Sequence, residues 1–393
     1  MTKNYYYKDP AMQFEFTEEE QMIRETASQF AENQLKPNAQ KLDEGDHELY
    51  ISQIKELAEL GFMGMTVQEQ YGGIGGSTVA FSLAVTEIAR GCASTATATS
   101  VTNMVAEVIQ AVGNEEQKAH YLPKFCTGEF LAGAFCLTEP SAGSDPSAMR
   151  TTAVEDGDNY IINGSKIFIT SAKFAGVFVV WAVTDPSAPR GKGISCFLID
   201  ANTPGMNIAK PEDKMGQRAS STCEVSFNDC VIPKSALMGE LNKGFKIAIG
   251  ELAGGRIGIG SLALGIGLEA MDYASDYIKE RKQFGQELSK FQGLQFMVSD
   301  RYTELEASRL LLLQAAYNKD QGLPFGTAAS MAKLFASEKA NDACYTALQC
   351  LGGAGYIKEY PVERFVRDVR LTAIYEGTSE IQRVIIARDK LQS

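Results

Sequence analysis

The first 125 residues of the chain carry a helical pattern of hydrophobic and polar positions. Apolar side chains recur on one helical face over residues 23–30, and Thr17 with Glu20 matches a capping box at the start of that helix. Pro37 predicts its end, and a second helix is expected over residues 51–60, with a stop at the glycine that follows. This region is therefore expected to be helical.

The pattern changes to β-strand character between about residues 130 and 235. Tyr160–Ile162 and Lys166–Thr170 flank the pair Asn163-Gly164, which can supply the positive φ angles of a tight turn, so a β-hairpin is predicted here. Further strands are predicted where β-branched and aromatic residues cluster, at Val177–Trp181, Ile194–Ile199 and Thr222–Phe227. Because no helical pattern separates these strands, the sheet should be mainly antiparallel, as a barrel or sandwich.

From about residue 240 to the end of the chain the helical pattern returns. Long helices are expected near 243–280, 291–319 and 325–351. The pair Gly352-Gly353 is expected to end the third of these helices, and a final helix should begin at Thr378 or Ser379. The C-terminal part of the chain is therefore predicted to be a helical bundle.

These patterns predict an α+β fold with a β-domain between two helical domains. The expected domains are 1–128 (N-terminal helices), 129–239 (middle β-barrel or sandwich) and 240–393 (C-terminal bundle). Two GxGxxA segments, at 258–263 and 265–270, match part of a dinucleotide-binding pattern. Both lie inside one helical stretch with no preceding strand, so we interpret them as small residues for close helix packing.

Composition and charge limit the chemistry that the chain can perform. The formal net charge of −12 argues against nucleic-acid binding and against an anionic-membrane anchor. The eight cysteines include no CxxC pair, so they are interpreted as buried apolar residues of a reducing compartment. With only two histidines, His47 and His120, a Ser–His or Cys–His nucleophile and a His-rich metal site are disfavoured. Carboxylate or cofactor chemistry without a metal is expected.

The N-terminus shows neither a signal-peptide nor a transit-peptide pattern, so a cytoplasmic location is expected. The tract MTKNYYYKDPA, residues 1–11, is interpreted as an unstructured extension. The longest apolar stretch, around 247–268, is interrupted by Glu251 and Arg256 and is rich in glycine. It is not predicted to span a membrane.

Five short segments hold residues suited to ligand binding and catalysis. They are CLTEPSAGSD (136–145), KIFITSA (166–172), RKQFGQELSKFQ (281–292), QCLGGAGY (349–356) and IYEGTSEIQR (374–383). Taken alone, each has an ordinary explanation, such as a polar loop, a buried strand, a solvated helix face or an acid at a helix start. Together, in this order and spacing, they resemble the acyl-CoA dehydrogenase family, closest to its short-chain, butyryl-CoA type. The resemblance covers nearly the whole chain.

The resemblance implies an FAD cofactor whose flavin ring lies against the middle domain. The loop 136–145 would contact the ring through Thr138 and its neighbours, and Thr170 would form a hydrogen bond near flavin N5. Phe168 stands where the family usually carries Trp; it keeps a flat apolar face but lacks the indole N–H. This difference bears on flavin shielding and on contact with the electron acceptor.

The resemblance also implies that the adenine half of FAD is held by a neighbouring subunit. Arg281 offers bidentate donors for the pyrophosphate, and the glycines after a helix in the segment 349–353 expose backbone N–H groups. The expected FAD contacts are Cys136, Leu137, Thr138, Gly143, Ser144, Phe168, Ile169, Thr170, Arg281, Phe284, Gln292, Gln349, Cys350, Leu351, Gly352, Gly353, Thr378, Ser379 and Glu380. The arginines at 364, 367 and 370 are interpreted as ion-pair partners, not as phosphate ligands.

Glu376 matches the family's catalytic base. It would remove the α-proton of an acyl-CoA while the β-hydrogen leaves as hydride to flavin N5, giving the trans-2-enoyl-CoA. A related branch places the base near position 254, where this chain has Gly254 and Gly255, which cannot serve. The expected substrate contacts are Ser144, Ala253, Gly254, Gly255, Arg256, Tyr375 and Gly377.

The expected partners follow from the same resemblance. They are an acyl-CoA substrate, an electron-transfer flavoprotein as acceptor and further copies of the chain, in a tetramer. The substrate is expected to be short and straight, with butyryl-CoA as the central candidate. Three alternatives remain open: an enoyl-CoA reductase or an acyl-CoA oxidase on the same scaffold, a DNA-associated family member, and a purely structural flavoprotein.

Overall fold

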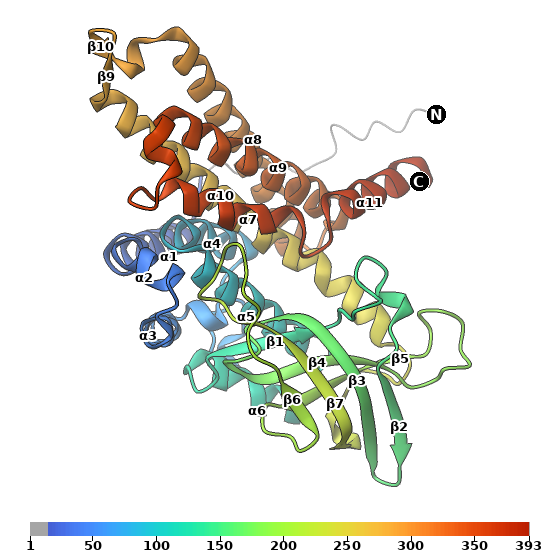
Figure 1. Ribbon diagram of the computed structural model, residues 1–393. Coiled ribbons are helices and arrows are strands. Elements are labelled where there is room, and N and C mark those ends of the chain that lie inside the picture. The colour runs from blue at the N-terminus through green and yellow to red at the C-terminus, as the bar shows by residue number, and fades with distance from the viewer. Residues whose placement is uncertain (1–14, 393) are drawn as a thin grey trace.

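The computed structural model describes residues 15–392, so the extension expected over residues 1–11 lies outside the described residues. The described chain forms helices, then a β-sheet, then a second set of helices (Figure 1). The sheet lies at one end of the molecule, and the C-terminal helices extend away from it. This order confirms the expected α+β class.

The N-terminal helices begin with the predicted capping box. Thr17 Oγ1 accepts a hydrogen bond from the Glu20 N–H at 3.1 Å, and Glu20 Oε2 accepts one from the Thr17 N–H at 2.9 Å. The first helix ends at Phe30 and continues through a π turn into a 3₁₀ turn that contains Pro37. The helices are α1 (Glu18–Phe30), α2 (Ala39–Asp43), α3 (His47–Glu59), α4 (Thr78–Gly91), α5 (Ala93–Val112) and α6 (Glu115–Cys126).

The middle region forms the predicted sheet. Its strands are β1 (Ala132–Cys136), β2 (Thr152–Asp156), β3 (Asn159–Thr170), β4 (Ala175–Val183), β5 (Ile194–Asp200), β6 (Met206–Ile208), β7 (Thr222–Pro233) and β8 (Leu237–Met238). They follow the order β6-β7-β3-β2-β4-β5-β8, with β1 paired to β4. Strand β4 pairs in parallel with β1 and with one residue of β2, and the other pairs are antiparallel, so the mainly antiparallel prediction is confirmed.

The predicted hairpin at Asn163-Gly164 is wrong. Both residues lie inside the single strand β3, and the chain reverses earlier, between β2 and β3, next to Gly157 with φ 58°. Gly164 lies at a register shift between β3 and β7, and a Cβ there would be 2.5 Å from Thr151 Oγ1. Asn163 Nδ2 donates to Asp229 Oδ1 at 3.0 Å on β7. The Asn-Gly pair therefore marks a β-bulge with close packing, because the same backbone freedom serves a bulge as well as a turn.

The C-terminal helices confirm the three predicted long helices and the final one. They are α7 (Gly244–Glu280), α8 (Gln292–Asp320), α9 (Gly326–Leu351), α10 (Val362–Arg370) and α11 (Ser379–Gln392). Gly352, with φ 60°, ends α9 as expected. The short strands β9 (Lys282–Gln283) and β10 (Gln286–Glu287) form a small hairpin between α7 and α8, and helix α10 adds to the predicted set.

The glycines of α7 serve close packing, as their helical context predicted. A Cβ at Gly260 would lie 2.5 Å from a methyl group of Leu312 on α8, and Gly258 contacts Ser100 on α5. By length and composition α7 could cross a membrane, but 61% of its apolar window is buried inside the protein. It packs against α4, α5, α8 and α9 as the central helix of the molecule.

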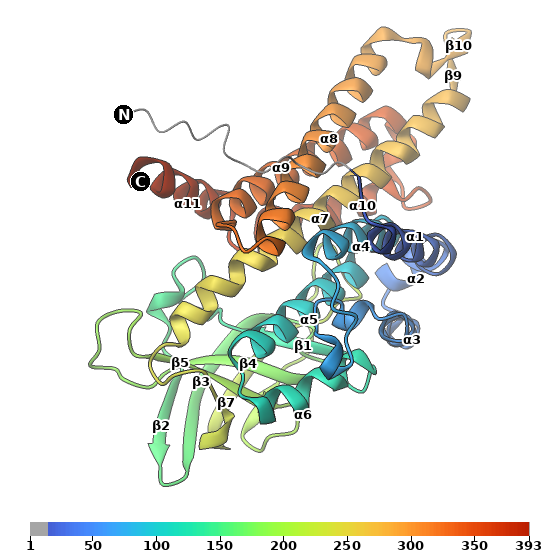
Figure 2. The same ribbon diagram turned by 180° about the vertical axis from the view of Figure 1, so that it is seen from behind.

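Two hydrophobic cores position the site. One joins the N-terminal helices to the C-terminal bundle, and the other fills the space between α5, α6 and the sheet (Figure 2). Trp181 Nε1 on β4 donates to the Gly244 carbonyl at 2.8 Å, which ties the sheet to the first residue of α7. Helices α5 and α7 therefore connect all three parts of the chain.

Candidate active site

Glu376 lies in the short loop between α10 and α11. Its φ of 54° is uncommon for a residue with a Cβ, and Gly377 follows with φ 88°. Such backbone conformations cost on the order of 1–3 kcal/mol and persist where the surroundings hold them, which occurs often at functional sites. The loop brings the carboxylate of Glu376 against Gly255 on α7, where a Cβ would lie only 3.1 Å from Oε2.

The Glu376 carboxylate is shielded from water at one oxygen, Oε2, and that oxygen accepts no hydrogen bond from the described part of the chain. Burial raises the pKa of Glu376 to about 7, although Arg256 and Lys333 act to lower it. A carboxylate with a pKa near neutral pH is suited to proton abstraction, because it is a stronger base than an exposed glutamate and still ionises.

Two buried cations face this carboxylate. Arg256 on α7 is 7% exposed; its Nη1 donates to Ser330 Oγ at 3.3 Å, and its Nε has no partner among the described residues. Lys333 on α9 is fully buried, and burial lowers its pKa to about 8 although the charge of Glu376 opposes that shift. Both cations favour the ionised form of Glu376.

The backbone around Glu376 is held through its carbonyl groups. Gln382 Nε2 on α11 donates to the Glu376 carbonyl at 3.1 Å and to the Gly377 carbonyl at 2.9 Å, and Lys333 Nζ donates to the Gly377 carbonyl at 2.8 Å. Within residues 15–392, no carbonyl or side chain accepts a hydrogen bond from the Glu376 N–H. That N–H is available to a ligand.

Tyr375 connects the loop to the middle domain. Its hydroxyl accepts a hydrogen bond from Gln217 Nε2 at 3.4 Å, and Gln217 Oε1 accepts one from Thr97 Oγ1 on α5 at 2.7 Å. The Gln217 N–H also donates to Asp368 Oδ1 on α10 at 2.5 Å. Burial raises the pKa of Tyr375 to about 12, so this hydroxyl stays protonated at neutral pH.

The loop 136–145 leaves β1 and changes from buried to exposed along its length. Cys136 and Leu137 are buried and Thr138 is half-buried, whereas Gly143 and Ser144 are exposed. A Cβ added to Gly143 would meet no atom within 4 Å, so open space adjoins this part of the loop. The predicted ligand contacts of the exposed half are accessible.

A buried ion pair fixes the start of this loop. Lys166 Nζ on β3 donates to Glu139 Oε1 at 2.8 Å, and both side chains are at most 3% exposed. The Glu139 carboxylate also accepts from the N–H groups of Arg150 and Thr151. Its retention in the interior is explained by these three donors, one ammonium and two backbone amides, since a buried charge needs its hydrogen bonds satisfied.

The end of β3 presents an exposed aromatic residue beside hydroxyl groups. Phe168 is 65% exposed with φ 56°, Ile169 is buried, and Thr170 is half-buried. Ser171 follows with φ 61°, and its buried Oγ has no partner among the described residues. An exposed phenyl ring held by a strained backbone, next to polar atoms without partners, fits a flat ligand with a polar edge.

The remaining expected FAD contacts lie at a distant part of the bundle. Arg281 follows α7, Phe284 lies between β9 and β10, and Gln292 begins α8, at the end of the bundle far from the β-sheet (Figure 1). All three are exposed, and Phe284 is 93% exposed with φ 52°. Arg281 forms no ion pair within residues 15–392. One copy of the chain therefore does not bring Arg281 to Thr138 and Thr170.

The segment 349–353 lies at the end of α9. Gln349, Gly352 and Gly353 are exposed, whereas Cys350 and Leu351 are 4% exposed and belong to the helical core. Added Cβ atoms at the two glycines would meet nothing within 4 Å. Exposed glycines let an anionic group approach the backbone N–H groups, and the exposed aromatic ring of β3 fits a flat ligand.

The expected substrate contacts on α7 adjoin Glu376. Ala253, Gly254 and Gly255 are buried; a Cβ at Gly255 would lie 2.7 Å from Met104 Sδ on α5. A Cβ at Gly254 would lie 3.1 Å from Lys319 Nζ, which pairs with Glu107 at 2.8 Å. The structure thus brings Gly255, Arg256, Tyr375 and Gly377 together around Glu376. Ser144 lies apart from this group, on the loop that follows β1 in the middle domain.

Three expected contacts follow Gly377. Thr378 is half-buried and its Oγ1 accepts from the Ile381 N–H at 3.3 Å, so it caps α11. Ser379 is buried, with an Oγ that has no partner in the described chain, and Glu380 is exposed. Of these three residues, Ser379 is the one with a buried polar atom that has no partner among the described residues.

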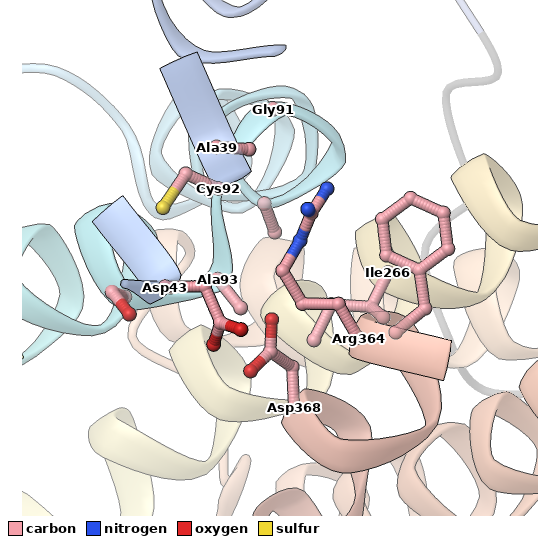
Figure 3. Close-up of a pocket in the computed structure, with 11 residues that line it drawn as sticks. Ala39, Asp43, Gly91, Cys92, Ala93, Ile266, Arg364 and Asp368 are labelled. Atoms are coloured by element: carbon pink, nitrogen blue, oxygen red, sulfur yellow. The ribbon is translucent and has the colours of Figure 1, made fainter. Parts of the chain in front are cut away.

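A separate small cavity lies between α10, α2 and the junction of α4 and α5 (Figure 3). Arg364 extends into it, and the carboxylates of Asp43 and Asp368 lie beside one another at its lining. Arg367, next to this cavity, pairs with Asp43 at 2.7 Å and with Glu363 at 2.7 Å, as its interpretation as an ion-pair partner predicted. The cavity is not part of the Glu376 site.

The sequence interpretation missed Lys333, Gln382 and Gln217. Lys333 had a detectable signal, because it interrupts a face of α9 made of small residues. That face contains Ala329, Ala332, Ala336 and Ala340. Gln382 and Gln217 had none, since a glutamine within a polar stretch gives no indication of which distant carbonyl it contacts.

Comparison with known proteins agrees with this geometry. Family models of the acyl-CoA dehydrogenase N-terminal, middle and C-terminal domains match residues 17–129, 134–230 and 242–391. A short-chain specific acyl-CoA dehydrogenase of Clostridium acetobutylicum is 45% identical over 96% of this chain and 99% of its own. An acryloyl-CoA reductase (NADH) of Anaerotignum propionicum is 43% identical over 97% and 96%.

Solved structures show the same fold. Butyryl-CoA dehydrogenase from Megasphaera elsdenii superposes with a TM-score of 0.93 at 41% identity, over 97% of this chain and all of that one. A further neighbour in the family is solved with FAD. The chain belongs to the acyl-CoA dehydrogenase family, and it is an FAD-dependent oxidoreductase.

Proposed function

We propose that the chain oxidises a short, straight acyl-CoA to the trans-2-enoyl-CoA, with Glu376 as the base. One observation carries this proposal. One oxygen of the Glu376 carboxylate, Oε2, is buried without a hydrogen-bond partner in the described chain, and it lies against a glycine where any larger residue would displace it. A structural glutamate would instead use both oxygens in hydrogen bonds or an ion pair.

The proton step follows from the loop geometry. The α-C–H of a thioester is a weak acid whose removal becomes possible when the enolate oxygen meets fixed donors in a dry site. The free N–H of Glu376 is such a donor, and the carbonyl contacts of Gln382 and Lys333 fix the loop that carries it. Bound substrate would exclude water from Glu376 and raise its pKa further, toward that of the carbon acid.

FAD supplies the two-electron acceptor for the β-hydride when it is bound. In this proposal the middle domain of one copy holds the ring, through the residues 136–138, 143–144 and 168–170. A neighbouring copy contributes Arg281, Phe284, Gln292 and the segment 349–353, while Thr378, Ser379 and Glu380 lie on the ring side. The separation of these sets within one chain supports an assembly of at least two copies, and we propose a tetramer.

The acyl group would lie between α5 and α7. Met104 of α5 adjoins Gly255, and Ser100 of α5 contacts Gly258 one turn farther along α7. Because α5 and α7 are already in contact one helical turn beyond Glu376, a pocket between them has little depth. This supports a short acyl group over a long one. Ala253–Arg256, Tyr375 and Gly377 would line this pocket, and Ser144 would contact the pantetheine arm.

The proposed electron acceptor is an electron-transfer flavoprotein, and the proposed location is the cytoplasm. The similar acryloyl-CoA reductase supports keeping the reverse reaction, reduction of an enoyl-CoA, as a second candidate. The oxidase alternative depends on how fast the reduced enzyme reacts with oxygen.

An anaerobic titration tests the proposal. The purified FAD enzyme is mixed with acyl-CoAs of increasing length, with branched and aromatic acyl-CoAs as comparison, and flavin bleaching is followed. Complete bleaching with butyryl-CoA and weak bleaching with long chains is the expected result. Strong preference for long, branched or aromatic acyl groups contradicts the substrate assignment. Bleaching by NADH indicates the reductase, and rapid reoxidation by oxygen after bleaching indicates the oxidase.

A further inference from the structure

Lys333 is a buried cation on an otherwise small-residue face of α9. Its side chain is fully buried, and its Cα lies 3.4 Å from where a Cβ of Gly260 on α7 would be. Its ammonium group makes one hydrogen bond, to the Gly377 carbonyl at 2.8 Å. Within residues 15–392 it forms no ion pair shorter than 4 Å. A buried ammonium group that uses only one of its three N–H donors destabilises the folded protein. The presence of Lys333 at this position therefore needs an explanation.

The hydrogen bond to Gly377 alone does not supply that reason. Gln382 Nε2 already donates to the same carbonyl at 2.9 Å and is itself fully buried. The carbonyl would therefore keep a donor if position 333 carried an apolar side chain of similar length. What Lys333 adds beyond Gln382 is its positive charge, and that charge faces the loop that carries Glu376.

We propose that Lys333 is a positioning residue whose charge, placed beside the Glu376 loop by its hydrogen bond to the Gly377 carbonyl, keeps the Glu376 carboxylate ionised. This inference rests on the proposed function, since it assumes that ionised Glu376 is the base. Lys333 touches neither the substrate nor the reacting atoms in this proposal; it acts through the field at the carboxylate.

Other charged and titratable groups surround Lys333 and Glu376. Arg256 of α7 is a second cation on the same carboxylate, so loss of Lys333 leaves one cation in place. Tyr375, next to Glu376 in the loop, is protonated at neutral pH. Glu338 of α9 and Glu380 of α11 act on Lys333 and favour its charged form. Glu251 lies about one turn back along α7 from Gly255, and near it Glu107 of α5 pairs with Lys319 of α8 at 2.8 Å.

The sign of the expected effect follows from these charges. A positive charge favours the ionised carboxylate, so removing it raises the pKa of Glu376. The reaction needs the ionised form, so the pH profile of flavin reduction should move to higher pH. A nearby charge shifts a carboxyl pKa by about 1–3 units, and partial compensation by Arg256 places the expected shift at about one unit.

The test compares Lys333→Gln and Lys333→Met with Lys333→Arg, all as FAD-loaded enzymes mixed anaerobically with butyryl-CoA well below saturation, where the pH profile reports the groups of the free enzyme. The first two should reduce flavin about fivefold more slowly than the parent at pH 7, because a shift of about one unit from near 7 lowers the ionised fraction from about one half to about one tenth. The rate should recover above about pH 9. Lys333→Arg, which keeps the charge, should keep the parental profile. Lys339→Gln is the matched control: Lys339 is a half-buried lysine of the same helix that pairs with Glu304 and Asp342, and its loss should leave the pH profile of flavin reduction unchanged.

A second readout does not depend on catalysis. The infrared band of the protonated Glu376 carboxyl, assigned by its loss in Glu376→Gln, should titrate at higher pH in Lys333→Gln than in the parent. If neither neutral variant folds, the reciprocal measurement uses Glu376→Gln. There the ¹⁵N signal of Lys333 Nζ should titrate at lower pH than in the parent, since the coupling between two sites is mutual.

The outcomes separate this inference from the proposed function. An unmoved pH profile or an unmoved carboxyl titration in Lys333→Gln overturns the role of Lys333, and so does an unmoved Nζ titration in the reciprocal test. If those shifts are absent while Glu376→Gln still abolishes flavin reduction, only the inference fails. If Glu376→Gln reduces flavin at the parental rate, the proposed base is wrong.

Discussion

The contact between Gly255 and Glu376 gives a prediction with two opposing contributions. Gly255→Ala adds one methyl group, whose carbon would lie 2.7 Å from Met104 Sδ and 3.1 Å from Glu376 Oε2. Replacing glycine by alanine inside a helix contributes roughly 0.5–1 kcal/mol of stability. Overpacking a dense interior costs about 1–3 kcal/mol. The net change in the free energy of unfolding should therefore be modest, between about zero and 2.5 kcal/mol of destabilisation.

The effect on chemistry should be much larger than the effect on stability. Met104 can move its flexible end. The backbone of Glu376 is held by the strained loop, so the added methyl group must push the carboxylate out of its position. A misplacement of about 1 Å can cost about 10²-fold in rate. We expect Gly255→Ala to slow flavin reduction by butyryl-CoA by ~10- to 10²-fold, with FAD content unchanged.

Gly250→Ala is the matched control for this experiment. It lies on the same helix, and a Cβ there would meet no atom within 4 Å. Urea unfolding and anaerobic stopped-flow mixing are measured for both variants. Gly250→Ala should gain about 0.5–1 kcal/mol of stability and reduce flavin at the parental rate. A parental rate in Gly255→Ala would refute the placement of the base against α7.

Three further predictions concern the ion pair, the cofactor and the pH profile. Lys166→Met leaves the buried Glu139 without its cation and should cost about 3–5 kcal/mol in urea unfolding, whereas Lys234→Met, which breaks an exposed pair with Glu155, should cost less than about 1. Arg281→Ala should lower FAD retention on gel filtration with an unchanged circular-dichroism spectrum; parental retention would contradict the shared FAD site. Flavin reduction should rise with pH through about 7 as Glu376 loses its proton, because burial raises the pKa of that group; a flat profile from pH 5 to 9 would contradict this.

Much of the fold could be predicted from local patterns. The capping box at Thr17, the long helices of the bundle and the mainly antiparallel sheet depend on nearest-neighbour chemistry and hydrophobic period, which a single sequence contains. Asn163-Gly164 was misinterpreted because the same two residues suit a turn and a bulge, and the choice between them depends on Thr151 and β7, which are remote in sequence.

The candidate site likewise has one part that the sequence predicts and another part that depends on contacts between distant segments. Glu376 was found through the resemblance of its segment to a family, since an acid at a helix start is ordinarily a surface residue. The features that make it chemically suitable are tertiary: the contact with Gly255, the buried cations Arg256 and Lys333, and the hold of Gln382 on the loop. These contacts join α7, α9 and α11, and no local pattern specifies which faces of three helices meet.

The measurement that tests the account most directly is single-turnover flavin reduction in Glu376→Gln. Glutamine preserves the volume of the side chain but lacks the basic carboxylate, so the variant should fold, keep FAD and bind butyryl-CoA. Reduction should slow by ~10²–10⁴-fold or more, because a positioned base contributes about that much. Burial also raises the pKa of Glu251 to about 7, so Glu251→Gln serves as the control and should keep near-parental chemistry, whereas Glu380→Gln, at an expected FAD contact, should perturb flavin binding or stability. Reduction of Glu376→Gln at close to the parental rate, with a slow Glu251→Gln, would contradict the account and transfer the role of base to Glu251.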